Sequence, residues 1–323
     1  MDRQPRSNRN QLSGLWAALC TPWRRDGRLD EAALAGNVAK LAAAGVDGVY
    51  TTDSDGEFYA IELEEFQHLA QTFGAAVRHC NVPASMGVTW SDTAGIIRRI
   101  EAACEAGISL VHVGFPFFME LTAQDAKDFW ADLARAVPGA KWVHYAHPRC
   151  GPVMTARDYR WLADEFPNQF VGTKLTGSDV LTLAALTAST PEIAHFVGDR
   201  TLATGYWLGA RGCYSYWVNT LPAWQKRYCE ICAAGDWSTA RVYFDRLEEW
   251  ERTAMQPLRD RGYRHAALAK ARAALSGWLD DSGALRAPYQ PILPTDLDRL
   301  KKAFDEYWRT ELAQEAFPRP GIK

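Results

Sequence analysis

Lys174 lies near the end of the apolar run QFVGTKL, residues 169–175. A charged side chain in such a run is costly to bury unless it finds a partner or takes part in chemistry. One interpretation is a lysine whose stem follows apolar surface until its amine reaches water. The other is a buried amine, because desolvation disfavours the protonated form and frees a lone pair that attacks a carbonyl carbon to form a Schiff base.

Tyr145 ends the neighbouring apolar run AKWVHYA, residues 140–146. If the two runs are adjacent strands of a barrel, alternate side chains face inward, and Tyr145 can share the interior with Lys174. A phenol at that place can carry protons at a forming imine or a cleaving bond. An aromatic ring that only fills the barrel is the other interpretation, and spacing alone does not separate the two.

The segment TTDSDGE, residues 51–57, places Asp53, Asp55 and Glu57 where an apolar run ends. Asp, Ser and Gly are typical of turns, because they bond their own backbone or tolerate unusual dihedral angles. We therefore expect Asp53, Ser54 and Gly56 to shape a turn.

These residues need elements that bring strand ends together. Eight short apolar runs, each followed by a stretch with helical spacing, predict a parallel sheet covered by helices. Eight such units favour a closed (β/α)8 TIM barrel of the α/β class, with an open doubly wound sheet as the alternative. The predicted strands are 14–20, 47–52, 82–88, 108–115, 140–146, 169–175, 193–198 and 211–217.

Three regions follow from the pattern. Residues 1–11 form a polar tail, residues 12–236 form the barrel with the active site, and residues 237–323 form a C-terminal helical region. The helices predicted near and within this last region are 222–234, 237–257, 261–279 and 295–313. In such barrels the loops after the strands carry the chemistry, which directs attention to Lys174, Tyr145 and the acidic loop.

Composition limits the partners. A formal net charge of -3 without basic runs gives no reason to expect nucleic acid or an anionic membrane. The longest apolar stretches are too short to span a bilayer. Seven cysteines and the polar start MDRQPRSNRNQ lead us to expect a cytoplasmic protein.

Neither a metal nor a cofactor is expected. His144, His147 and Cys150 have ligand-like spacing, but on a strand followed by Pro148 they would not converge on one zinc ion. The glycines of residues 206–213 do not form a dinucleotide fingerprint. Imine chemistry supplies its own electron sink, so it needs no cofactor.

The chain resembles the dihydrodipicolinate synthase and N-acetylneuraminate lyase superfamily, Schiff-base-forming barrels that act on pyruvate and other 2-oxo acids. The resemblance implies that Lys174 forms the imine, that Tyr145 is the catalytic tyrosine and that Ser54 takes part in catalysis. It also implies that Asp55, Gly56 and Glu57 help to bind the substrate carboxylate, and that the protein is a homo-oligomer, a dimer or a tetramer. The segments that carry the resemblance are GLWAALCTPWRRDGRLD, AAAGVDGVYTTDSDGE, VHYAHPRCG, FVGTKLTGSD, LGARGCYSYWVNTLP and LAKARAALSGWLDDSGALRAPY.

The acidic loop departs from the pattern of this superfamily, which usually reads Gly-Thr-Thr-Gly-Glu. Here Asp53, Ser54 and Asp55 replace the first three residues. A second carboxylate beside a bound carboxylate is repulsive by a few kcal/mol in a partly desolvated pocket. Either Asp55 turns away from the ligand, or it is protonated, or the substrate presents another group there. The first alternative makes Asp55 a turn residue, and the third makes the carboxylate pocket an unusual one. We expect Asp55 to face the ligand, because its position matches a substrate-contacting residue of the superfamily.

A second departure concerns GFPFFME, because Phe117 and Phe118 lack the hydroxyl that lysine-pathway synthases of this superfamily donate across a subunit interface. Arg149 matches their semialdehyde-binding arginine only with a gap, so we do not expect a dihydrodipicolinate synthase. We expect an aromatic substrate pocket instead. Its predicted residues are Phe117, Phe118, His147, Arg149, Tyr214 and Trp217.

The segments ARAVPGAKWVHYAHP and KARAALSGWL are similar to the hydroxybenzylidenepyruvate hydratase-aldolases. The resemblance therefore implies a lyase, a pyruvate-dependent aldolase or hydratase-aldolase that cleaves a 4-hydroxy-2-oxo acid or a benzylidenepyruvate-like acid. Its partners would be a 2-oxo acid such as pyruvate and an aldehyde. The alternative is a dehydratase or deaminase of a 2-oxo-3-deoxy sugar acid or a hydroxyproline-derived acid. The third is a non-catalytic small-molecule sensor on the same barrel.

Overall fold

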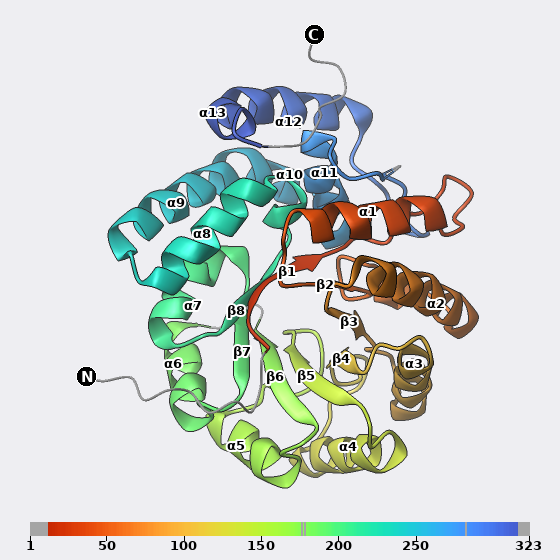
Figure 1. The fold of residues 1–323 in the computed structure, drawn as a ribbon. Coiled ribbons are helices and arrows are strands. Elements are labelled where there is room, and N and C mark those ends of the chain that lie inside the picture. Colours follow the sequence, from red (N-terminus) through yellow and green to blue (C-terminus); the bar gives the residue numbers. More distant parts are fainter. Residues whose placement is uncertain (1–11, 176, 178, 282, 316–323) are drawn as a thin grey trace.

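Eight parallel strands close into a barrel that is surrounded by helices (Figure 1). The computed structural model describes residues 12–315 except residues 176, 178 and 282, so the predicted tail 1–11 lies outside the described residues. Strand β8 pairs with β1, which confirms the predicted TIM barrel and excludes the open sheet. The strands are β1 Gly14–Ala18, β2 Gly48–Thr51, β3 Ala84–Gly87, β4 Leu110–Val113, β5 Lys141–Ala146, β6 Phe170–Leu175, β7 Ala194–Val197 and β8 Gly212–Ser215.

One helix follows each strand and covers the outside of the barrel. Their starts are encoded locally: Thr122 and Thr155 open α4 and α5 with capping boxes completed by Asp125 and Asp158. The helices are α1 Glu31–Ala43, α2 Leu63–Cys80, α3 Thr93–Glu105, α4 Ala123–Ala136, α5 Ala156–Glu165, α6 Val180–Ser189, α7 Leu202–Leu208 and α8 Pro222–Ala234. Among the described residues, no helix combines the length and apolar character needed to cross a membrane.

Aromatic side chains fill the inside of the barrel. Trp16, Tyr50, Phe196 and Tyr214 belong to one buried cluster that is separate from the larger core between strands and helices. The rings of Phe196 and Tyr214 stack with centroids 4.4 Å apart. A Cβ at Gly212 would lie 2.2 Å from the Phe196 ring, so this strand needs a glycine there. The floor of the site is therefore closely packed.

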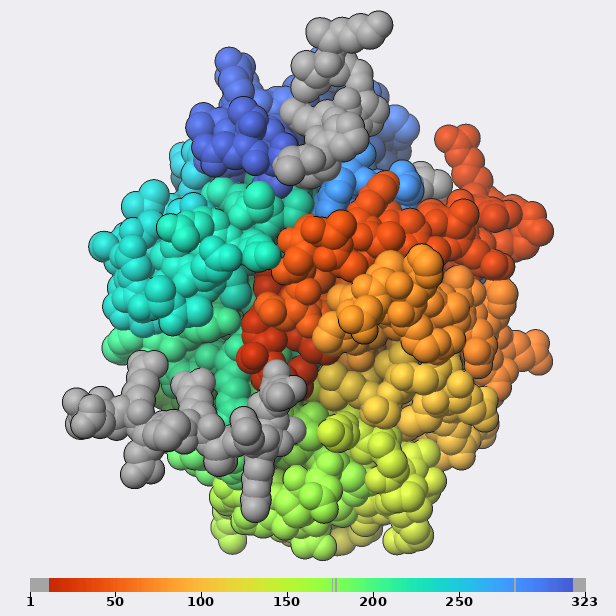
Figure 2. Space-filling model, viewed as in Figure 1, coloured from red at the N-terminus to blue at the C-terminus, as the bar shows by residue number. Residues whose placement is uncertain are grey.

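The chain after the barrel is helical, as predicted. The C-terminal elements lie beside α8 and α1 (Figures 1 and 2). Asn37 of α1 ties this region to the barrel through two 2.8 Å hydrogen bonds with the backbone of Asp280. The elements are α9 Trp237–Trp250, a π-helical turn Glu251–Met255, α10 Gln256–Asp260, α11 His265–Ser276, α12 Pro294–Tyr307 and α13 Arg309–Leu312.

Candidate active site

Lys174 and Tyr145 stand side by side at the carboxyl ends of β6 and β5. The pairing of these strands skips Val171, after which Tyr145 and Lys174 are direct partners in register. Lys174 is only 7% exposed, and its Nζ lies 4.3 Å from the centroids of the Tyr145 and Tyr50 rings. The strand geometry thus places an amine among phenol rings inside the barrel.

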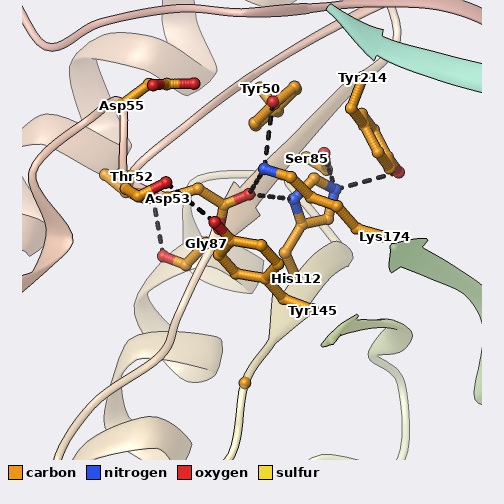
Figure 3. Close-up of polar contacts among 12 residues, drawn as sticks. Tyr50, Thr52, Asp53, Asp55, Ser85, Gly87, His112, Tyr145, Lys174 and Tyr214 are labelled. Atoms are coloured by element: carbon orange, nitrogen blue, oxygen red, sulfur yellow. Dashed lines mark hydrogen bonds and ion pairs between the residues drawn. The ribbon is translucent and has the colours of Figure 1, made fainter. Parts of the chain in front are cut away.

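Asp53 is the partner of this amine. Its Oδ2 lies 2.6 Å from Lys174 Nζ, which also donates to the Tyr50 hydroxyl at 3.1 Å (Figure 3). Thr52 precedes it with a φ of 62°, rare for a β-branched residue, and the Thr52 hydroxyl bonds the Gly87 carbonyl oxygen at 2.8 Å. This unusual backbone lets the next residue enter the barrel. Asp53 opens the expected turn, because its carbonyl oxygen accepts from the Gly56 amide, but its side chain, which is 1% exposed and ion-paired with Lys174, enters the barrel.

His112 of β4 holds the other side of the Asp53 carboxylate. His112 Nδ1 lies 2.7 Å from Asp53 Oδ2, and Nε2 lies 3.0 Å from the Ser85 hydroxyl and 3.1 Å from the Tyr214 hydroxyl. Burial lowers the pKa of His112, although Asp53 acts in the opposite direction, so the ring is neutral at pH 7. A neutral ring with a carboxylate at Nδ1 carries its proton there and donates it to Asp53, while Nε2 accepts.

Asp53 is ionised in this arrangement. Burial alone would raise its pKa, but the charge of Lys174 and the hydrogen bond from His112 outweigh burial and leave the pKa below its usual value. A carboxylate thus lies within hydrogen-bonding distance of Lys174 at the bottom of the site.

Tyr145 and Ser54 form a hydroxyl pair on the other side of Lys174. The Tyr145 hydroxyl lies 2.9 Å from Ser54 Oγ. Burial, with the charge of Asp53, raises the pKa of Tyr145 well above its ordinary value, so the phenol keeps its proton at neutral pH. The Tyr145 and Ser54 pair can therefore donate a proton and accept one back, and the Tyr145 phenol is protonated before the reaction starts.

A cavity of about 830 Å³ opens above this pair. Ser54 and Tyr145 lie at its base, and the C-terminal region supplies much of its wall. The aromatic residues of the wall are Phe58, Tyr59, Phe117, Tyr263 and Tyr289, and the residues with cationic or imidazole groups are His147, Arg149, Arg261, Arg264 and His265. Such a cavity has room for a ring-bearing ligand that contacts Ser54 and Tyr145, and Tyr145 is a neighbour of Lys174.

The second half of the acidic loop turns away from Lys174. Asp55 Oδ1 lies 2.8 Å from Nε2 of His265 on α11, and Figure 3 shows Asp55 apart from the lysine cluster. Burial raises the pKa of Asp55, but the ion pair with His265 outweighs burial and keeps the pKa below its usual value. Of the three alternatives for Asp55, the geometry favours the first, in which its side chain faces elsewhere, and so goes against the expectation that Asp55 faces the ligand.

Gly56 and Glu57 are bound into the protein. A Cβ at Gly56 would lie 2.4 Å from the Thr52 nitrogen, and the Gly56 amide donates to the Asp53 carbonyl oxygen. The Glu57 carboxylate accepts from Trp23 Nε1 and from the backbone nitrogen of Arg286, both at 2.9 Å. The structure therefore directs Glu57 to the C-terminal region and not to the cavity predicted for it.

The predicted aromatic pocket is partly assembled. Phe117, His147 and Arg149 line the cavity. Tyr214 lies beneath Lys174, with its ring centroid 5.6 Å from Nζ. The structure does not bring the other two to the site. Phe118 is 84% exposed, and Trp217 is buried against Trp308 with ring centroids 5.3 Å apart, so its alternative interpretation as a packing residue is the one that fits.

Sequence reasoning missed three residues that contact the amine or its partner: Asp53, Tyr50 and His112. A polar residue inside the apolar run ISLVHVGF, residues 108–115, is a signal that singles out His112. The Asp that replaces a glycine at residue 53 is a second signal. Neither says that the two side chains meet, because that depends on the inward direction of two different strands.

Comparison with known proteins identifies the family of the chain. The model of the dihydrodipicolinate synthetase family matches residues 11–306. Trans-O-hydroxybenzylidenepyruvate hydratase-aldolase of Pseudomonas aeruginosa is 26% identical over 306 residues, which cover 88% of this chain and 88% of that protein. N-acetylneuraminate lyase of Rhizobium meliloti (strain 1021) is 25% identical over 295 residues, covering 91% of this chain and 94% of that one.

A solved structure has the same fold. YagE, a prophage protein of the dihydrodipicolinic acid synthase family from E. coli K12 in complex with pyruvate, matches with a TM-score of 0.82 at 22% identity. The match covers 92% of this chain and 99% of that chain. The family match extends over nearly the whole barrel and the helices behind it. The chain therefore belongs to the dihydrodipicolinate synthetase family and is an enzyme of its class I aldolase and lyase type.

Proposed function

We propose that the protein is a pyruvate-dependent aldolase or hydratase-aldolase in which Lys174 forms a Schiff base with a 2-oxo acid. One observation carries this proposal: the Lys174 amine lies beside the Tyr145 ring, and Tyr145 and Ser54 form a hydroxyl pair that lines a large cavity. An amine attacks the ketone, and the phenol supplies the proton that the ketone oxygen needs.

The imine then acts as an electron sink. When the bond between C3 and C4 of a 4-hydroxy-2-oxo acid breaks, its electrons move into the imine and give an enamine, and the 4-hydroxyl proton leaves as the aldehyde forms. Tyr145, with Ser54, is the nearest hydroxyl pair that can take this proton. Protonation of the enamine at C3 and hydrolysis of the imine release pyruvate and the free lysine.

The substrate carboxylate meets an altered loop. His265 holds the Asp55 side chain, which keeps its negative charge paired and reduces repulsion of a bound carboxylate. We assign the carboxylate contact to the Ser54 hydroxyl and the backbone of the loop. Glu57 supports this loop from behind through its bonds to Trp23 and Arg286.

The side chain of the substrate is proposed to carry an aromatic ring. Phe58 and Phe117 meet edge to face with centroids 6.0 Å apart, and Tyr59 and Tyr289 do so at 4.9 Å. These four rings form an apolar wall above the amine, a surface suited to stacking against an aryl aldehyde. The hydratase-aldolase relative is named for a benzylidenepyruvate, and this agrees with the wall.

Product analysis tests the proposal. The purified protein is incubated with a 4-hydroxy-4-aryl-2-oxobutanoate or a benzylidenepyruvate, and the products are separated and identified. Pyruvate released together with an aryl aldehyde supports the aldolase. Loss of water or ammonia with an intact carbon skeleton would replace it with the dehydratase or deaminase, and binding without turnover or borohydride labelling would leave only a sensor.

We also propose that the enzyme is cytoplasmic and that it forms a homotetramer. Light scattering after size exclusion measures the mass of the assembly directly. A mass of one chain would refute the tetramer without touching the proposed chemistry.

A further inference from the structure

We propose that Asp53 is a catalytic residue, the acid and base that exchanges a proton with the Lys174 nitrogen while the imine forms. This inference rests on the Schiff-base function proposed above and adds a second proton carrier to it. Asp53 takes the first proton from the lysine nitrogen and later gives it to the hydroxyl that leaves as water, while the Tyr145 and Ser54 pair carries the protons of the addition step.

The Lys174 amine and the Asp53 carboxylate form a buried pair. Asp53 Oδ2 lies 2.6 Å from Lys174 Nζ, and both side chains are buried below the cavity. On the far side His112 Nδ1 donates to the same oxygen at 2.7 Å. Water has little access to this pair, so a proton that leaves Nζ has a carboxylate as its nearest acceptor.

One oxygen of the Asp53 carboxylate remains available to accept a hydrogen bond or a proton. Asp53 Oδ1 is buried and has no hydrogen-bond partner among the described residues. The oxygen lies against Gly87, where a Cβ would come within 2.2 Å of it. A glycine therefore provides the space for this carboxylate. A buried charge with one unsatisfied oxygen is costly to keep, which is expected of a group that is retained for chemistry.

An ammonium cannot attack a ketone, so the ion pair must first become a neutral pair. The Nζ proton moves to Asp53 Oδ2, which leaves a neutral amine and a neutral acid. Burial disfavours both charges of the pair, although their mutual attraction holds the pKa of Asp53 below its usual value. The net charge of the site does not change.

The remaining protons balance in two steps. The amine forms the bond to the ketone carbon, the ketone oxygen takes the Tyr145 proton, and the nitrogen returns a proton to Tyr145 to give the neutral carbinolamine. Asp53 then gives its proton to the carbinolamine hydroxyl, the bond between carbon and oxygen breaks, and water leaves. The nitrogen lone pair forms the double bond, and the iminium lies beside the regenerated carboxylate.

The rate of imine formation tests this role. The protein is mixed with pyruvate, samples are quenched with borohydride at increasing times, and the fraction of labelled chain is read by intact mass. Asp53→Asn preserves the shape but cannot take the proton, and we expect labelling to slow by about 10²-fold to 10⁴-fold. Asp199→Asn is the matched control: Asp199 is also fully buried, but its carboxylate accepts from the backbone nitrogens of Tyr216 and Trp217 and not from the Lys174 amine.

Chemical rescue distinguishes proton transfer by Asp53 from a role in positioning Lys174. Asp53→Gly removes the carboxylate and leaves its space, so sodium formate is expected to restore labelling at least tenfold in this variant and not in Asp53→Asn, where the amide fills the space. A slow variant that formate does not restore would overturn the proton-transfer role and leave Asp53 as a positioning residue.

The remaining outcomes are distinct. Labelling of folded Asp53→Asn at the wild-type rate, or equal slowing in Asp199→Asn, would overturn the role of Asp53 while the Schiff-base function stands. Wild-type protein that gains no label from pyruvate or any other 2-oxo acid would overturn both.

Discussion

Two buried lysines of this protein lie near carboxylates, but their surroundings differ. Lys270, in α11, donates to the carbonyl oxygens of Thr21 and Ala284 at 2.7 Å each, with Glu57 at 3.5 Å and Asp281 at 3.4 Å. Lys174 has a carboxylate, a phenol oxygen and phenol rings around it, and the base of a cavity beside it.

The difference supports our proposal that Lys270 is a structural lysine and Lys174 a reactive one. Lys270 donates its N–H groups to backbone oxygens of two segments, so moving its amine would leave several buried acceptors unpaired. Lys174 can give one proton to a single carboxylate and then turn its lone pair to a ligand. Burial beside an acid therefore does not by itself identify a reactive lysine, and we propose that the neighbouring cavity lined by Ser54 and Tyr145 makes the difference for Lys174.

Removal of the reactive amine should have the largest effect. We expect Lys174→Gln to lower turnover on the order of 10⁶-fold, the scale seen when a nucleophile is removed from its catalytic group. The substitution keeps a hydrogen-bond donor near Asp53, so the fold should survive, which circular dichroism checks. Turnover within tenfold of wild type would refute covalent catalysis by this residue.

Loss of the phenol proton carrier ranks second. Tyr145→Phe should lower turnover by roughly 10²-fold to 10⁴-fold and leave imine trapping detectable, because it removes a proton carrier and little volume. Tyr159→Phe is the matched control, since Tyr159 is buried and its hydroxyl bonds His144 at 2.7 Å, outside the cavity wall around Lys174. Equal activities for the two variants would return Tyr145 to a packing role.

The structural lysine should show the opposite pattern. Lys270→Met leaves Glu57 and Asp281 buried without their cation, and we expect the free energy of unfolding to fall by about 3–5 kcal/mol. Urea unfolding measures this change. Labelling of Lys174 by pyruvate and borohydride, per folded molecule, should persist. A stability change below about 1 kcal/mol would show that the cluster around Lys270 does not hold the C-terminal region in place.

The smallest effect belongs to Asp55 and depends on pH. Its folded pKa lies below the unfolded value of about 3.9, because the ion pair with His265 outweighs burial. A depressed carboxyl pKa stabilises the fold above the unfolded pKa, and this contribution disappears as pH falls through the folded pKa. Asp55→Asn should therefore cost about 1 kcal/mol near neutral pH, with the partly exposed His265 limiting the effect, and progressively less as the pH falls below the unfolded pKa and through the folded pKa.

Two unfolding series, one for wild type and one for Asp55→Asn, provide the test. A stability difference between the two proteins that grows as the pH falls would contradict a lowered pKa of Asp55. The affinity for pyruvate offers a second readout: Asp55→Thr, which restores a hydroxyl at this position, should leave it nearly unchanged if His265 holds the side chain away from the ligand.

Much of the fold could be predicted because it depends on local sequence patterns, such as apolar runs and helical spacing. The apolar runs that end at Tyr145 and Lys174 are buried on both faces, which only a covered parallel sheet requires. The helix predicted for residues 237–257 shows the limit, because the π-helical turn Glu251–Met255 interrupts it. Glu251 pairs there with Arg272 of α11, a tertiary contact that helical spacing does not reveal.

The site could be predicted where the position along a strand decides it. Lys174, Tyr145 and Ser54 are brought together, and their roles remain predictions. Trp217 and Glu57 were expected at the cavity, but both contact the C-terminal helical region, whose packing cannot be read from the barrel pattern.

The attachment point of a trapped substrate tests the central claim most directly. The protein is reduced with borohydride in the presence of pyruvate, digested, and the modified peptides are sequenced by mass spectrometry. The account predicts one carboxyethyl group per chain, on Lys174, with Lys270 and the exposed Lys141 unmodified. A carboxyethyl group on Lys270 or Lys141, or none on Lys174, would contradict it.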